Sequence, residues 1–225
     1  MNIYERFKEY LSIYGKYYPK EILDYINDYF FEDLEEKKSS YFVNELYSKL
    51  GVYSKEEDHY LAYLNLMKKY FSFDCNILEI AGGFYPVMAE KVSSLQISGK
   101  GSITVYDPHL LFEKKDPLIL KKQEFTKNDS MKGYDFCYGI MPCEATEVMV
   151  RKANSEKKPF FLGLCGCIAH LPLSLMYGAT ENRWFNYIGN IHDKTKDDEC
   201  ETTVEYLDNS YGIDYPILIK TYPKK

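Results

Sequence analysis

The stretch "NILEIAGGFYPVMAEKV", residues 76–92, constrains the fold more than any other part of this sequence. It begins with a short apolar run typical of a buried strand, continues with two glycines, and then shows a helical pattern of apolar residues. Pro86 suits the first turn of that helix because the amide hydrogen it lacks would have no partner there. The stretch therefore predicts a strand, a glycine turn and a helix. The turn either approaches a ligand or only joins the two elements.

Further strand-like segments follow this turn, and helical or polar segments separate them. We expect strands at 101–107, 119–125 (the weakest), 134–140 and 158–166, and a helix over 144–154. Residues 202–208 and 215–223 predict an antiparallel hairpin. Alternating strands and helices predict a mostly parallel sheet covered on both faces. The expected fold class is therefore α/β, a doubly wound sheet with a C-terminal antiparallel hairpin.

Residues 1–72 differ in pattern from the rest of the chain, because their apolar residues recur at helical spacing. The last of three apolar stripes consists of Tyr60, Leu61, Leu64, Met67 and Phe71. We therefore expect two parts, an all-α N-terminal segment over 1–72 and the sheet domain over 73–225.

Composition excludes several classes of protein. A net charge of −6 disfavours a general nucleic-acid binder, which needs a basic surface. No apolar run reaches the roughly 18 residues that a membrane helix needs, and the N-terminus is charged where a signal peptide is apolar. We therefore expect a cytoplasmic protein without nucleic-acid or membrane partners. Its six cysteines are then expected as thiols or ligands rather than disulfides.

Two neighbouring motifs carry a resemblance to a known family. Residues 79–85 are Glu-Ile-Ala-Gly-Gly-Phe-Tyr, and the second expected strand ends in "TVYD", with Asp107 24 positions after Gly83. An acidic residue within the first strand, a glycine turn and a second strand ending in Asp resemble the class I S-adenosylmethionine-dependent methyltransferases. That family usually has three glycines in this turn, and here Ala81 and Tyr85 stand at the first and third positions.

The resemblance implies a Rossmann-like methyltransferase domain that binds S-adenosylmethionine and methylates a small molecule. Asp107 would hold the ribose hydroxyls, and the helical N-terminal segment would lie on the substrate side, where the family carries variable lids. The implied cofactor-binding residues are Glu79, Ala81, Gly82, Gly83, Phe84, Tyr85, Asp107, Pro108, Ile140 and Met141. Two alternatives stay open: transfer of the aminobutyryl group, as in proteins similar to nicotianamine synthase, and a related protein that binds a ligand or partner without catalysis.

Other candidate residues follow the expected strands at 134–140 and 158–166. Glu144 either complements the dipole of the next helix or acts as a general base. Arg183, His170 and His192 belong to a crossover that could line the acceptor pocket. The residues with metal-binding or reactive side chains at this edge are Cys143, Cys165, Cys167 and His170. Their spacing is not a common zinc pattern, so we expect buried thiols rather than a metal site. A reactive thiol stays an open alternative, because a cysteine near a helix N-terminus has a lowered pKa. The sequence indicates neither the acceptor nor the oligomeric state.

Overall fold

The computed structural model describes residues 59–83, 86–97, 99–110, 113–142, 144–164, 183–207 and 216–223. The strands are β1 (Ile77–Ile80), β2 (Ile103–Tyr106), β3 (Ile119–Lys121), β4 (Phe136–Ile140), β5 (Phe160–Gly163), β6 (Glu201–Glu205) and β7 (Ile217–Thr221). The helices within these ranges are α5 (His59–Tyr70), α6 (Val87–Ser93), α7 (Ala145–Ser155) and α9 (Arg183–Thr195). None of these helices is long and apolar enough to cross a membrane.

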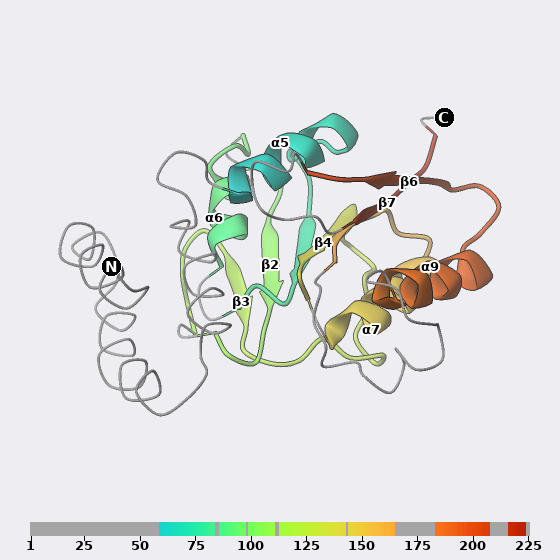
Figure 1. Ribbon diagram of the computed structural model, residues 1–225. Helices are drawn as coiled ribbons and strands as arrows, with labels where there is room; N and C mark the ends of the chain where they lie inside the picture. Colours follow the sequence, from blue (N-terminus) through green and yellow to red (C-terminus); the bar gives the residue numbers. More distant parts are fainter. Residues whose placement is uncertain are drawn as a thin grey trace, which may run out of the picture. The chain divides into compact units, whose positions relative to one another are not determined.

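The seven strands form one sheet in the order β3-β2-β1-β4-β5-β7-β6 (Figure 1). Strands β1 to β5 pair in parallel, whereas β7 is antiparallel to both β5 and β6. The order reverses between β1 and β4, because the chain builds outward from β1 on one side and from β4 on the other. The predicted doubly wound sheet with a C-terminal antiparallel hairpin is confirmed.

Helices cover both faces of the sheet (Figure 1). Helices α5 and α6 pack with alternate strand residues such as Ile77, Ile103 and Phe136, whereas α7 and α9 pack with the intervening set, including Leu78 and Cys137. Successive side chains of a strand point to opposite faces, so a strand buried on both faces is apolar throughout. This explains the fully buried pattern of β1, β2, β4 and β5.

Helix α5 belongs to the core of the sheet domain. Tyr63 and Met67 are fully buried, and the Tyr63 ring lies over Gly163, where a Cβ atom would approach ring atom Cε1 to 2.9 Å. The helical prediction is confirmed for this segment. One member of the expected apolar stripe does not lie in the core. Leu61 is 47% exposed, and Tyr63 lies in the core instead. Residues 1–58 lie outside the described ranges, so a separate helical segment there stays a prediction. Helix α5 itself packs with the sheet, although the expected division at residue 72 assigned it to the helical segment.

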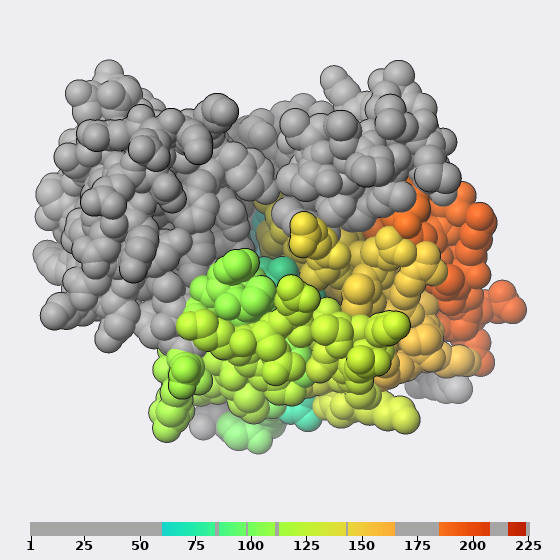
Figure 2. Space-filling model, turned by 90° about the horizontal axis from the view of Figure 1, so that it is seen from below, coloured from blue at the N-terminus to red at the C-terminus, as the bar shows by residue number. Residues whose placement is uncertain are grey.

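The segment between β3 and β4 packs against the C-terminal half of α7. Glu156 accepts hydrogen bonds from the Met131 backbone N–H (2.8 Å) and the Ser130 hydroxyl (3.1 Å), and Lys152 donates to the Lys127 carbonyl (3.2 Å). In Figure 2 the green atoms of this segment accordingly adjoin the yellow and orange atoms of the α7 region. These contacts hold the two halves of the sheet together outside the strands.

Candidate cofactor site at the carboxyl ends of β1, β2 and β4

The expected site residues lie at the carboxyl ends of adjacent parallel strands. Ala81 to Gly83 follow β1, Asp107 follows β2, and Met141 follows β4. Strands β1 and β4 are the neighbours between which the strand order reverses. In open α/β sheets, ligands bind in the crevice at this reversal, outside the carboxyl ends of the strands.

The turn after β1 depends on the absence of side chains. Gly83 has φ +72°, in the left-handed region that glycine enters without a steric cost. At Gly82 a Cβ atom would lie 2.5 Å from Cγ1 of Val105, so packing against β2 requires glycine. Ala81 also has φ +63°, and its backbone N–H donates to the Tyr106 carbonyl at 2.8 Å. A non-glycine residue in this region costs about 1 kcal/mol, which the surrounding structure must offset.

Asp107 ties the end of β2 to this turn. Its Oδ2 accepts the Gly83 backbone N–H at 2.7 Å, and its Oδ1 accepts the His109 backbone N–H at 2.7 Å. The residue is only 6% exposed. An ionised carboxylate has about four acceptor positions, so these two bonds leave capacity for further donors such as hydroxyl groups. Asp107 therefore shapes the turn and can also serve as an acceptor for a ligand.

Glu79 of β1 also lies next to the turn. It is 3% exposed, and its Oε2 lies 3.3 Å from the position that a Gly82 Cβ would take. Two buried carboxylates, those of Glu79 and Asp107, thus lie next to the turn. Negative charge there favours a positively charged group and opposes a phosphate.

The end of β4 forms the other side of the strand-order reversal. Ile140 is 8% exposed, and Met141 is half-buried with φ +52°, its backbone N–H donating to the Gly163 carbonyl at 2.7 Å. A non-glycine residue with left-handed backbone conformation therefore follows each of the two strands at which the strand order reverses: Ala81 follows β1, and Met141 follows β4. Such backbone strain clusters at binding and active sites. Glu144 is exposed at the start of α7, without a side-chain capping bond.

The remaining candidate residues divide into exposed ones and ones that the structure does not describe. Pro108 and His109 are exposed beside Asp107. The candidates outside the described residues are Phe84, Tyr85, Cys143, Cys165, Cys167 and His170, together with the side chain of Arg183. Their predicted roles stay predictions. The residues that are described contain no group of three potential metal ligands.

The sheet order, the antiparallel β7 and the acidic residue after β2 match the expectation drawn from the sequence motifs. The chain has the class I methyltransferase fold. The glycine turn after β1 and Asp107 after β2 lie next to the end of β4. That they hold the nucleoside is what the resemblance predicts.

Three solved structures with similar folds have low sequence identity to this chain. No family model and no curated protein matches it. A Listeria monocytogenes protein described as a candidate S-adenosylmethionine-dependent methyltransferase has a TM-score of 0.47 at 10% identity, over 74% of this chain and 99% of its own. A mutant of MtNAS in complex with S-adenosylmethionine has a TM-score of 0.42 at 11% identity, over 73% of this chain and 63% of its own. A Bordetella parapertussis protein described as a candidate exported protein has a TM-score of 0.43 at 11% identity, over 74% of this chain and 67% of its own.

Replacing Gly82 with alanine is expected to lower the free energy of unfolding by about 2 kcal/mol, because the new Cβ overlaps Val105 and forces a buried strand to shift. Chemical denaturation measures the change. In a Val105→Ala background the overlapping methyl is absent, so Gly82→Ala should cost much less there. Gly189→Ala, in α9 where nothing lies within 4 Å of the new Cβ, should instead stabilise by about 1 kcal/mol. Equal costs in both Val105 backgrounds would contradict the packing argument.

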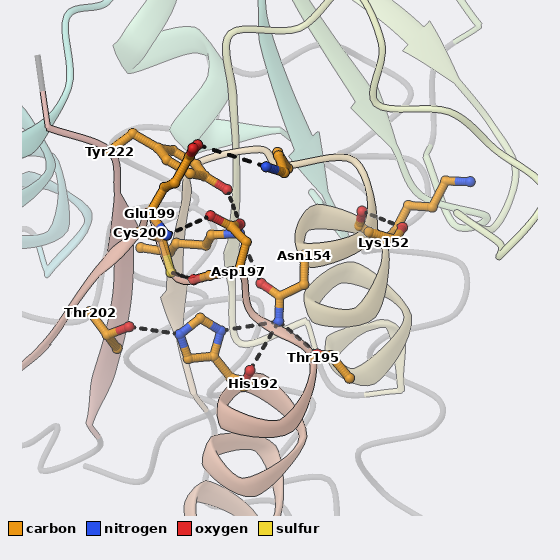
Figure 3. Close-up of polar contacts among 12 residues, drawn as sticks. Lys152, Asn154, His192, Thr195, Asp197, Glu199, Cys200, Thr202 and Tyr222 are labelled. Carbon is orange, nitrogen blue, oxygen red and sulfur yellow. Dashed lines mark hydrogen bonds and ion pairs between the residues drawn. The ribbon is translucent and has the colours of Figure 1, made fainter. Parts of the chain in front are cut away.

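A second polar cluster lies at the end of the sheet opposite the candidate site, near the amino end of β5 (Figure 3). Lys220 of β7 is fully buried there, and its Nζ donates to Asn154 Oδ1 at 3.1 Å and faces Asp197 Oδ2 at 3.4 Å. His192 packs edge-on against Phe160, the first residue of β5, with ring centroids 5.4 Å apart. His192 therefore does not line a pocket at the carboxyl edge, and that expectation is wrong.

The direction of the hydrogen bonds in this cluster is fixed by Lys220, which can only donate. Asn154 must present its amide oxygen to Lys220, so its Nδ2 faces His192 Nδ1 at 3.2 Å (Figure 3). Nδ1 must then accept, and the ring proton resides on Nε2, which donates to the Thr202 hydroxyl at 2.9 Å. Protonating Nδ1 would place two donors against each other.

Acid is accordingly expected to destabilise the fold through His192. Burial, with Lys196 and Lys220 nearby, lowers the pKa of His192 from 6.5 to about 4. Between those values the unfolded chain binds a proton that the folded chain does not, so stability falls as pH drops from about 6.5 to about 4. The total loss is about 3 kcal/mol. Urea unfolding across this pH range should show the free energy of unfolding falling with pH in the parent protein. In His192→Gln the free energy should fall less. An unchanged slope in the variant would refute the assignment.

Proposed function

We propose that this protein binds S-adenosylmethionine at the Gly82–Gly83 turn and transfers its methyl group to a small-molecule acceptor. The observation that carries the proposal is that two buried carboxylates, those of Glu79 and Asp107, lie next to Gly82 and Gly83 of the turn. S-adenosylmethionine carries a positive sulfonium and a positive ammonium group, which such a site favours. A dinucleotide would instead place its pyrophosphate at this turn, close to the buried Glu79 carboxylate.

The described residues fit this cofactor. Gly82 keeps the turn free of a side chain, Asp107 has acceptor capacity for two ribose hydroxyls, and Ile140 and Met141 supply apolar surface at the end of β4. When bound, the cofactor supplies an electrophilic methyl group on a positively charged sulfur. The chain's own task is then to hold the acceptor in line with that methyl group and to exclude water, for which no nucleophilic side chain is needed.

Glu144 supports the transfer in this proposal by accepting a proton from the acceptor. Its side chain is exposed at the N-terminal end of α7, four residues after β4 ends at Ile140. An exposed carboxylate suits an acceptor that becomes acidic as it is methylated, such as an amine that turns into an ammonium ion. A nearby carboxylate also stabilises that positive charge.

Calorimetric titration of the purified protein tests the cofactor. We expect S-adenosylmethionine and S-adenosylhomocysteine to bind with dissociation constants on the order of micromolar, and NAD to give no heat. Binding of NAD alone would overturn the proposal. No heat with any of the three, from protein shown to be folded, would instead favour a protein without this cofactor activity. Once binding is established, mass spectrometry of reacted acceptors separates methyl transfer from aminobutyryl transfer by the added mass.

A further inference from the structure

Tyr138 of β4 is buried in a way that the fold alone does not explain. Its side chain is 0% exposed, yet a phenol hydroxyl in a core normally needs a hydrogen-bond partner. Its hydroxyl oxygen forms no well-aligned hydrogen bond to any other group within the described part of the chain. A phenylalanine would supply the same packing without a polar atom.

The sheet register places this hydroxyl next to Glu79. Tyr138 and Glu79 are paired residues on adjacent parallel strands, and their side chains therefore leave the sheet on the same face, about 5 Å apart at their bases. The Glu79 carboxylate reaches from there to the Gly82 turn, with Oε2 3.3 Å from the Cβ position of that glycine. Glu79 therefore lies between Tyr138 in the core and the turn at the candidate cofactor site.

The electrostatics agree with this arrangement. Burial, followed by the charge of Glu79 and hydrogen bonding to it, raises the pKa of Tyr138 well above its ordinary value. A hydroxyl that keeps its proton beside a carboxylate acts as a donor. A donor beside a buried carboxylate favours the ionised form, whereas desolvation favours the neutral form.

We propose that Tyr138 is a positioning residue: its hydroxyl donates to the Glu79 carboxylate and holds it, ionised, beneath the Gly82–Gly83 turn. The effect on cofactor binding rests on the proposed function, whereas the effect on Glu79 does not. The other titratable side chains on the elements that pack against this face, within the described residues, are Tyr60, Tyr63, Lys68, Lys69 and Tyr70 of α5, Glu90 and Lys91 of α6, and Asp107 after β2. Glu90 pairs with Lys115 at 2.8 Å, and Asp107 accepts two backbone N–H groups.

The test compares Tyr138→Phe with the parent protein, alone and in a Glu79→Gln background. Phenylalanine keeps the ring, so the variant is expected to fold. Without cofactor, the urea midpoint of Tyr138→Phe should lie below that of the parent at pH 8, and the gap should shrink as pH falls and Glu79 takes up its proton. In the Glu79→Gln background the gap should not change with pH. A gap that is independent of pH in both backgrounds, or absent, would overturn the proposal.

Binding gives the second readout. Tyr138→Phe should weaken S-adenosylmethionine about tenfold at neutral pH, which corresponds to the loss of one charge-assisted hydrogen bond. The acid side of its binding profile should also move to higher pH. Unchanged affinity and profile, in a parent protein that binds the cofactor, would overturn the positioning role. If the parent does not bind the cofactor but the pH-dependent stability gap appears and vanishes with Glu79→Gln, the Tyr138–Glu79 pair stands and only the proposed function fails.

Discussion

Replacing Asp107 with alanine is expected to abolish binding of S-adenosylmethionine and to lower the free energy of unfolding by about 3 kcal/mol. Two backbone donors, the N–H groups of Gly83 and His109, lose a charged acceptor at 2.7 Å in a site that water hardly reaches. Each hydrogen bond to a charged group contributes about 1.5–3 kcal/mol, and partial rehydration of the donors recovers some of the loss. Calorimetry measures the binding, and chemical denaturation measures the stability.

Asp107→Asn separates the two effects. The amide oxygen can still accept one N–H, but its NH₂ group faces the other donor, so we expect about half of the stability loss and much weaker binding. Asp198→Ala, at an exposed aspartate, should change neither quantity measurably. If Asp107→Ala binds the cofactor as the parent does, the site assigned to the end of β2 is wrong.

Removing Asp197 is expected to destabilise the protein by about 3 kcal/mol without affecting the candidate cofactor site. Lys220 is completely buried, and Asp197 is the carboxylate that faces it, at 3.4 Å. Tyr222 completes the arrangement, because its hydroxyl donates to Asp197 at 2.6 Å and its ring centroid lies 5.0 Å from the Lys220 ammonium. Asp197→Ala leaves a buried charge without its counter-ion, which is among the costliest single changes in a core.

Lys220→Met in the Asp197→Ala background should recover most of that loss, because the double variant no longer buries an unpaired charge. Lys114→Ala provides the exposed comparison. Lys114 pairs with Asp116 at 3.6 Å with both side chains more than 80% exposed, so breaking that pair should cost less than about 0.5 kcal/mol. Failure of Lys220→Met to restore stability would show that the loss in Asp197→Ala comes from Tyr222 or from the backbone instead.

Most of the sheet was predictable from local pattern. All seven expected strands are present, and the observed α7 begins and ends within one residue of the expected helix. The prediction of β1, β2, β4 and β5 succeeds because burial on both faces demands continuous apolar runs, and such runs are visible in the sequence. The exception in α5 is instructive. Leu61 has the expected spacing but faces outward, because the sheet presents Gly163 as a place for Tyr63 and so rotates the buried side of the helix.

The candidate site was predictable only in part. Glu79, Gly82, Gly83 and Asp107 follow from the resemblance, and the structure brings them together around one turn. Tyr138 was missed because nothing in an apolar strand sequence distinguishes a tyrosine that packs from one that faces a carboxylate. Only the pairing of β1 with β4 places it opposite Glu79. His192 was misplaced because its position depends on where α9 crosses the sheet, which no local pattern encodes.

By itself, the sequence determined where strands, helices and the glycine turn form, since these depend on side-chain periodicity and on backbone freedom within a few residues. The tertiary structure decided which of these residues meet. The Gly83 amide reaches Asp107 across 24 positions, Glu79 faces Tyr138 across 59, and Lys220 meets Asn154 across 66. Such pairs exist because strand order and register bring distant segments within hydrogen-bond range. That alignment is set by the cooperative burial of the whole core rather than by any one segment.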